Sequence, residues 1–241
     1  MALIVMKFGG TSVADSEKIR NVSSIIEDEY RKGNKVAAVL SAQGSLTDEL
    51  TEKAFEISNT PDKREMDVLL SSGEQISIAL CAMELLRRGV PAVSLTGWQA
   101  GIETNDTYGD ADIKNFSGGR LRRELEGGKV AVVAGFQGVC GDVNITTLGR
   151  GGSDTTAVFL AAALGADECR IYKDVKGIYT SEPKADPDAK LLSNISYDDM
   201  LALADSGSGV LHRKCIEIAK RNGIKISVAS SFYSGSGTVV G

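Results

Sequence analysis

Residues 129–139 read KVAVVAGFQGV, an apolar run that contains almost no polar side chain. A strand with one face in water alternates apolar and polar residues, whereas a strand that is apolar throughout suits a sheet covered on both faces. Residues 91–97, PAVSLTG, show the same pattern. Sheets covered on both faces consist mostly of parallel strands, so the two runs predict a mainly parallel sheet.

Short apolar runs and amphipathic stretches alternate along the rest of the chain. Further strands are predicted at residues 2–8, 35–42, 168–175 and 225–231. Helices are predicted at residues 16–33, 48–58, 64–90, 153–166, 196–207 and 210–223, the third with an interruption near residues 71–73. This alternation predicts an α/β fold, a three-layer α/β/α sandwich around a mainly parallel β-sheet. No linker, repeat or charge block divides the chain, so residues 1–241 are expected to form a single domain.

The composition argues against several classes of function. The 241 residues are 42% hydrophobic and 24% charged, with a formal net charge of -5. Binding of nucleic acid requires a basic face. No apolar stretch approaches the roughly 20 residues that span a bilayer, and the apolar start of the chain is too short for a signal peptide. We therefore expect a cytoplasmic protein with no nucleic acid and no membrane as partners.

Cysteine and histidine are sparse. The four cysteines form no C-x-x-C pair, which favours packed thiols over a zinc site or disulfides. The only histidine is His212, so a Ser-His-Asp triad or a multi-histidine metal site is hard to assemble.

Clusters of Gly, Ser, Thr and Asp follow several predicted strands, where ligands bind in parallel sheets. In KFGGTSV, residues 7–13, the N–H groups of Gly9 and Gly10 are suited to an anion, and Lys7 adds a positive charge. The order of residues differs from that of a Walker A loop and from G-x-G-x-x-G. Taken alone, the stretch also fits a plain turn.

A second cluster, TTLGRGGSDTT at residues 146–156, opens a predicted helix. Glycines surround Arg150, and either Ser153 or Asp154 is expected to cap the helix. A glycine loop at a helix N-terminus binds anions, and the Arg150 guanidinium fits a carboxylate or a phosphate. The alternative is that Asp154 only caps the helix and that Arg150 is only a surface charge. At the end of the strand predicted over 168–175, Asp174 suits a ribose or a metal, and Tyr179 in the stretch that follows suits an adenine. The alternative is that both belong to a surface loop.

Together, five stretches resemble the aspartokinase branch of the amino acid kinase family. They are KFGGTSVAD (7–15), SSGEQIS (71–77), TTLGRGGSDTTAVFLAAALGAD (146–167), DVKGIYTSEP (174–183) and VASSFYSGSGT (228–238). The resemblance implies transfer of the ATP γ-phosphoryl group to the side-chain carboxylate of L-aspartate, giving 4-phospho-L-aspartate. It also implies Mg²⁺, a homodimer and a place in amino-acid biosynthesis, that of lysine included. Aspartokinases typically continue into ACT domains, and residues 237–241, GTVVG, fall where their catalytic domain ends.

The resemblance also implies roles for individual residues. Lys7 would stabilise the transferring phosphoryl group, beside the amides of Gly9 and Gly10, and Asp154 would organise lysine and phosphate near Mg²⁺. On the substrate side, the resemblance places the hydroxyls of Ser41 and Thr47. Glu74 would bind the ammonium group of aspartate, and Arg150 would bind its α-carboxylate. The expected nucleotide contacts are Lys173, Asp174, Tyr179 and Lys184.

The chain departs from the aspartokinase pattern at a phosphate-side lysine. Gly209 stands where the usual aspartokinase motif, GAKVLHP, has a lysine. Lys7 is therefore expected to be the one family cation left at the reacting phosphate, unless Lys173, Arg213 or Lys214 replaces the missing lysine. Lys173 and Lys184 themselves replace a usual threonine and arginine. Three alternatives therefore stay open: a kinase-like subunit with weak or no activity, a kinase for another amino acid or carboxylate, and a dinucleotide-binding oxidoreductase. The sequence lacks the G-x-G-x-x-G motif that is typical of a dinucleotide-binding oxidoreductase, which argues against the third alternative.

Overall fold

A computed structural model of the chain describes residues 1–181, 186, 188–207, 210–233, 235 and 237–241. An eight-stranded sheet runs through the centre in the order β10-β12-β11-β9-β1-β2-β6-β3. All neighbouring strands in it are parallel except β11 and β12. The strands are β1 (Leu3–Phe8), β2 (Lys35–Leu40), β3 (Ala92–Leu95), β6 (Val130–Ala134), β9 (Glu168–Lys173), β10 (Asn194–Ile195), β11 (Ile226–Ser230) and β12 (Thr238–Val240).

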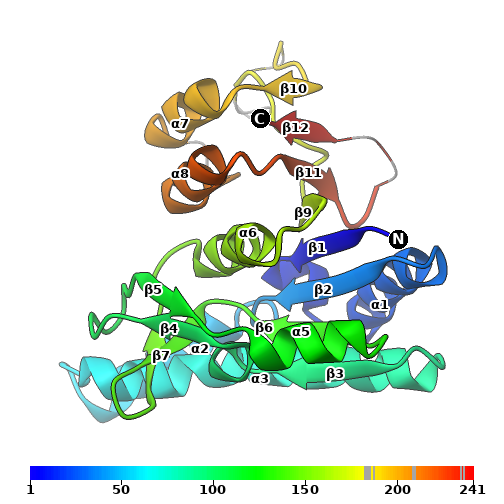
Figure 1. The fold of residues 1–241 in the computed structure, drawn as a ribbon. Helices are drawn as coiled ribbons and strands as arrows, with labels where there is room; N and C mark the ends of the chain where they lie inside the picture. Colours follow the sequence, from blue (N-terminus) through cyan, green and yellow to red (C-terminus); the bar gives the residue numbers. More distant parts are fainter. Residues whose placement is uncertain (182–185, 187, 208–209, 234, 236) are drawn as a thin grey trace.

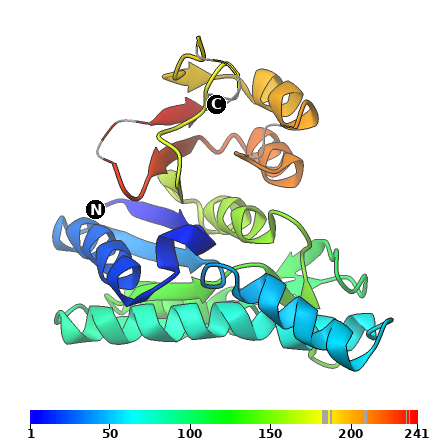
Figure 2. The ribbon, with the colours of Figure 1, turned by 180° about the vertical axis from the view of Figure 1, so that it is seen from behind.

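Helices cover both faces of this sheet, which confirms the predicted α/β sandwich. Figure 1 shows α5, α6, α7 and α8 on one side, and Figure 2 shows α1 and α3 on the other. The helices are α1 (Ser16–Arg31), α2 (Leu46–Ile57), α3 (Lys63–Arg87), α4 (Gly97–Ala100), α5 (Gly119–Glu126), α6 (Gly152–Leu164), α7 (Tyr197–Asp205) and α8 (Arg213–Asn222). A short 3₁₀ turn, Gly10–Val13, follows β1.

The alternation of side chains along β1 decides where Lys7 points. Ile4, Met6 and Phe8 belong to the apolar cluster under α1 and α3. Val5 belongs to the cluster on the other face, under α6. Because successive side chains of a strand point to opposite faces, Lys7 shares the α6 face with Val5. This lysine therefore lies at the carboxyl end of a central strand, facing the start of α6.

Residues 129–139 form two strands in different sheets, not the single strand that the apolar pattern predicts. β6 ends at Ala134, and β7 (Gln137–Cys140) belongs to a smaller sheet. That sheet has the order β5-β4-β7-β8, with β5 (Ile113–Phe116), β4 (Ile102–Thr104) and β8 (Asn144–Thr147). The break lies at Phe136, whose φ of 69° is unusual for a bulky residue. Hydrogen bonds to Thr156 Oγ1 (3.1 Å) and from the Leu148 N–H (2.8 Å) hold it there.

Helix α3 is continuous, so the predicted interruption near residues 71–73 is wrong. Gly73 serves close packing instead, because a Cβ at this position would lie 2.7 Å from the Ala42 Cβ. By length and composition alone, α3 is apolar enough to cross a membrane, a test that core helices of other proteins also pass. Its Asp67 and Glu74 are buried within the fold.

We expect Gly73→Ala to destabilise the protein by about 1–3 kcal/mol, because the added methyl group would press α3 away from Ala42. Alanine is the better helix former by about 1 kcal/mol, so a loss of stability would have to come from the packing. Urea unfolding of this variant, beside Ser72→Ala as a control on the same helix, measures the effect. A Gly73→Ala variant as stable as the unchanged protein would contradict the close packing.

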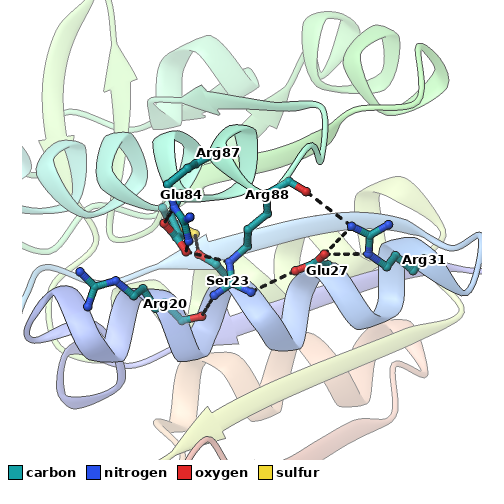
Figure 3. Close-up of polar contacts among 8 residues, drawn as sticks. Arg20, Ser23, Glu27, Arg31, Glu84, Arg87 and Arg88 are labelled. Carbon is teal, nitrogen blue, oxygen red and sulfur yellow. Dashed lines mark hydrogen bonds and ion pairs between the residues drawn. The ribbon is translucent and has the colours of Figure 1, made fainter.

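Arg88 joins α1 and α3 on the outer face of the molecule (Figure 3). Its guanidinium binds Glu84 Oε1 (2.7 Å), Glu27 Oε2 (3.0 Å) and the carbonyl oxygen of Arg20 (3.0 Å). Glu27 also accepts a hydrogen bond from Arg31 at 2.7 Å. These contacts fix the two helices on one side of the sheet, away from the cleft described next.

Candidate active site

A cleft of about 1220 Å³ opens at the carboxyl ends of the central strands. It brings together most of the residues that the resemblance implies, although they come from distant parts of the chain. The predicted site residues that line it are Lys7, Gly10, Ser41, Thr47, Glu74, Arg150, Asp154 and Lys173. Parallel sheets bind their ligands at this end, so the cleft is the candidate active site.

Two lysines bind one buried carboxylate at the inner end of the cleft. Lys7 Nζ lies 2.6 Å from Asp154 Oδ1, and Lys173 Nζ lies 2.7 Å from Asp154 Oδ2. The side chains of Lys7 and Asp154 are 5% and 4% exposed, and that of Lys173 is 18% exposed. Lys7 pairs with Ile171 in the β1–β9 register, so Lys173 lies two residues further toward the mouth. The three groups carry an excess of one positive charge, which suits an anion.

The pKa values of this cluster reflect burial and pairing together. Burial lowers the pKa of Lys7, and the attraction of Asp154 only partly opposes that shift. Burial would raise the pKa of Asp154, but Lys7 and Lys173 outweigh it and hold the pKa below its ordinary value. Asp154 is therefore a carboxylate that holds two ammonium groups in place.

The start of α6 places Asp154. The structure puts Gly151, with φ 71°, at the N-cap position, so the prediction of Ser153 or Asp154 as the cap is wrong. Asp154 lies instead in the first turn, where a negative charge favours the helix dipole. Gly135 allows the helix to approach β6, because a Cβ there would lie 2.7 Å from the Ser153 Cβ.

Glu74 is an acid with one unpaired oxygen. Its Oε1 accepts the Ala42 N–H at 3.0 Å, while its buried Oε2 has no partner among the described residues. The residue is 3% exposed, and burial raises its pKa to about 8. A cationic group bound in the cleft would supply the missing partner and favour the ionised acid.

The other predicted acceptor-side residues lie on the walls of the cleft. Ser41 follows β2, and Thr47 is in the first turn of α2. Arg150 is exposed, and within the described part of the chain no ion pair is formed by its guanidinium. An unpaired guanidinium at the edge of the cleft is suited to a carboxylate or a phosphate.

The two glycines after Lys7 differ in position. The Gly9 N–H donates to the carbonyl oxygen of Tyr172 at 3.4 Å, so it is turned toward β9. Gly10 lines the cleft, and a Cβ at this position would lie 2.8 Å from the Ala42 carbonyl oxygen. Close approach of the two backbones therefore explains the glycine at position 10.

The predicted nucleotide contacts are only partly brought together. Lys173 reaches Asp154, but Asp174 is exposed beyond the end of β9 and does not line the cleft. Tyr179 also lies outside the cleft lining, where it is half-buried and forms an isolated bridge with Leu191. Lys184 and Gly209 lie outside the described residues.

Lys173 is the candidate replacement cation that reaches the cluster. Arg213 lines the cleft but binds Asp205 (2.5 Å) and Glu217 (2.8 Å). Lys214 binds Asp110 at 2.7 Å and Asp112 at 3.4 Å. Lys7 is therefore accompanied by a second lysine at Asp154, and Lys173 is the one of the three expected replacements that makes this contact among the described residues.

Sequence reasoning missed several residues of the cleft wall, Asp67 and Phe136 among them. Asp67 is a fully buried acid on α3, and Phe136 has a left-handed backbone. No local pattern marks either of them, since an aspartate in an amphipathic helix is ordinary and the region of Phe136 is apolar throughout.

Comparison with known proteins agrees with the fold. The sequence model of the amino acid kinase family matches residues 2–230. The chain belongs to the amino acid kinase family. Its aspartokinase resemblance extends over its whole length: it is 54% identical over 240 residues to the aspartokinase of Geobacillus stearothermophilus.

Solved aspartokinase structures show the same fold. The aspartate kinase of Synechocystis superposes with a TM-score of 0.88 at 48% identity, covering 99% of this chain and 39% of that one. Aspartokinase III of E. coli, solved with aspartate and ADP, gives a TM-score of 0.88 at 29% identity, covering 99% of this chain and 64% of that one. The match covers all of this chain and 59% of the Geobacillus relative.

Proposed function

We propose that the protein transfers the γ-phosphoryl group of ATP to the side-chain carboxylate of L-aspartate, forming 4-phospho-L-aspartate and ADP. The observation that carries the proposal is the meeting of Lys7, Glu74, Arg150 and Asp154 in one cleft. The similarity to aspartokinases, one of them solved with aspartate and ADP, supports it. The central sheet takes strands from both ends of the chain, which supports one catalytic domain over residues 1–241.

The acceptor would be held by charges of opposite sign. The unpaired Oε2 of Glu74 would accept hydrogen bonds from the ammonium group, and Arg150 would bind the α-carboxylate. The hydroxyls of Ser41 and Thr47 would orient the side-chain carboxylate that attacks the phosphorus. Holding both reactants in line is most of what phosphoryl transfer requires of a protein.

The phosphates would bind at the lysine pair. Lys7, the inner lysine, would stabilise charge on the transferring group, and Lys173, nearer the mouth, would contact the nucleotide phosphates. Gly10 would allow close backbone approach. Asp174, Tyr179 and Lys184 are proposed to contact the remainder of the nucleotide.

Mg²⁺ is expected to accompany ATP and to neutralise charge on its phosphates. In the described part of the chain, no set of three or more His, Cys, Asp or Glu side chains is grouped to bind a metal. Both oxygens of Asp154 are also occupied by lysines. We therefore propose that the ion is held chiefly by phosphate oxygens, and we assign no protein ligand to it.

The experiment is a kinase assay with Mg²⁺-ATP and a panel of acceptors: L-aspartate, L-glutamate and carbamate. We expect ADP formation with L-aspartate and an acyl phosphate that hydroxylamine traps as a hydroxamate. Transfer to another acceptor would overturn the choice of substrate. Nucleotide binding without any phosphorylated product would favour a kinase-like subunit. A homodimer in the cytoplasm, serving biosynthesis of lysine and related amino acids, is part of the same proposal, and light scattering tests its mass.

A further inference from the structure

Asp67 is a buried carboxylate on α3 to which the proposed function gives no role. It is 0% exposed. Its Oδ2 accepts the N–H groups of Gly109 (3.0 Å) and Thr147 (2.9 Å), and its Oδ1 accepts the Thr147 hydroxyl (2.7 Å). Removing such an acid leaves buried donors without a partner, which destabilises the segments that carry them. Asp67 therefore links α3 to the loop at Gly109 and to the end of β8.

Thr147, which binds Asp67, lies three residues before Arg150 in the chain. Thr147 is the last residue of β8, and its carbonyl oxygen accepts the Ala111 N–H at 2.8 Å. The next residue, Leu148, donates its N–H to the Phe136 carbonyl oxygen at 2.8 Å. Arg150 follows two residues later, so its loop starts from an anchored backbone.

Gly109 supplies a second connection to the same loop. Its neighbour Asp110 packs on Gly149, where a Cβ would lie 2.6 Å from Asp110 Oδ1. Lys214 binds the same oxygen of Asp110 at 2.7 Å. Because Asp67 binds the Gly109 N–H, it also holds the neighbouring Asp110 in place. Asp110 packs against Gly149, which is the residue before Arg150.

Glu74 lies on the same face of the same helix. It follows Asp67 by seven residues, which is about two turns or roughly 10 Å along an α-helix. Hydrogen bonds fix α3 between these points as well, since the Ser71 carbonyl oxygen accepts the Gln137 side chain at 2.9 Å. The helix thus joins Glu74 rigidly to the loop that carries Arg150.

We propose that Asp67 is a positioning residue that sets the separation between Glu74 and Arg150, and so selects an α-amino acid as the acceptor. The inference rests on the proposed function, in which these two charges hold the ammonium and α-carboxylate groups. Asp67 itself touches neither reactant. Its loss should therefore weaken recognition of the acceptor and leave the lysine pair at Asp154 intact.

The test compares Asp67→Ala with Asp67→Asn, using Glu65→Gln, an exposed acid on the same helix, as the control. Asparagine can keep all three contacts, because its oxygen accepts both N–H groups and its NH₂ donates to the Thr147 hydroxyl. We expect Asp67→Ala to raise the KM for aspartate about tenfold or more and to leave the KM for ATP within about twofold. Asp67→Asn should restore most of the aspartate KM, and Glu65→Gln should change nothing.

Equal increases in both KM values, or an unchanged aspartate KM in folded Asp67→Ala protein, would overturn the proposal. If Asp67→Ala does not fold, Thr147→Val removes one hydrogen bond only, and it should still raise the aspartate KM selectively by a few-fold. An unchanged aspartate KM in that variant would also overturn it. Turnover of aspartate by the unchanged protein tests the proposed function separately. Without turnover, aspartate affinity measured by calorimetry replaces KM, so the two proposals can fail independently.

Discussion

Lys7→Met is expected to lower kcat for phosphoryl transfer by about 10²–10³-fold, the loss typical for removal of one preorganised stabilising group. Methionine is similar in length but carries no charge. Lys7 lies in a nearly dry end of the cleft, where a charge acts more strongly than it does in water. Coupled detection of ADP with saturating aspartate and Mg²⁺-ATP measures the effect.

The fold should survive this substitution, because Asp154 keeps Lys173 as a partner at 2.7 Å. Lys173→Met should have a smaller effect on kcat, since Lys173 is the more exposed and outer of the two lysines. Lys35→Met, at the opposite end of the sheet, is the matched control. Retention of more than about a tenth of the activity in Lys7→Met would show that another group stabilises the transferring phosphoryl group.

Glu74→Gln is expected to stabilise the ligand-free protein above pH 8 by up to about 5 kcal/mol, which is the free-energy equivalent of the pKa shift of the buried acid. Burial raises the pKa of Glu74 from 4.5 to about 8. Between these values the folded state binds a proton that the unfolded state has lost. The free energy of unfolding therefore falls as the pH rises from 4.5 to 8, and the penalty is fully present above 8.

Urea unfolding at pH 5 and pH 8.5 measures this dependence. The unchanged protein should lose more stability between the two pH values than Glu74→Gln loses, since glutamine does not titrate. Glu65→Gln, an exposed acid on the same helix, should behave as the unchanged protein. Identical pH profiles for Glu74→Gln and the unchanged protein would contradict the raised pKa.

Aspartate should reverse the preference of Glu74 for its protonated form. In the proposed complex, the ammonium group of aspartate would lie at Oε2 of Glu74, which has no partner among the described residues, and would favour the ionised acid and lower its pKa. Binding near pH 7 should therefore release a proton, which appears in calorimetry as a dependence of the binding enthalpy on the buffer. The same residue that weakens the free protein would thus bind the substrate.

Much of the fold follows from local patterns in the sequence. The fully apolar runs predict buried parallel strands, and the structure confirms this in β6. β3 is also parallel, but it lies at the edge of the sheet and only its Leu95 is buried. The break at Phe136 was not predictable, because it depends on hydrogen bonds to Thr156 and Leu148, which are distant in the sequence. The small sheet that begins after this break was missed for the same reason.

The candidate site shows a similar division. Motif resemblance identified Lys7, Glu74 and Arg150, which the structure brings into one cleft. It could not show that Lys173 reaches Asp154, because the side-chain direction depends on the register of β1 and β9. Asp67 was missed because its partners are recognisable only once α3 packs against the small sheet.

The break at Phe136 has a consequence for the engineering of this chain. Only Gly135 and Phe136 separate β6 from β7. A residue inserted here would break the hydrogen bonds of Phe136 and shift the pairing of Gln137 with Thr147. The turn between β7 and β8 is different, because Val143 is 67% exposed there. An epitope or a fluorescent reporter therefore belongs in that turn, where added length meets solvent and the register of both sheets is preserved.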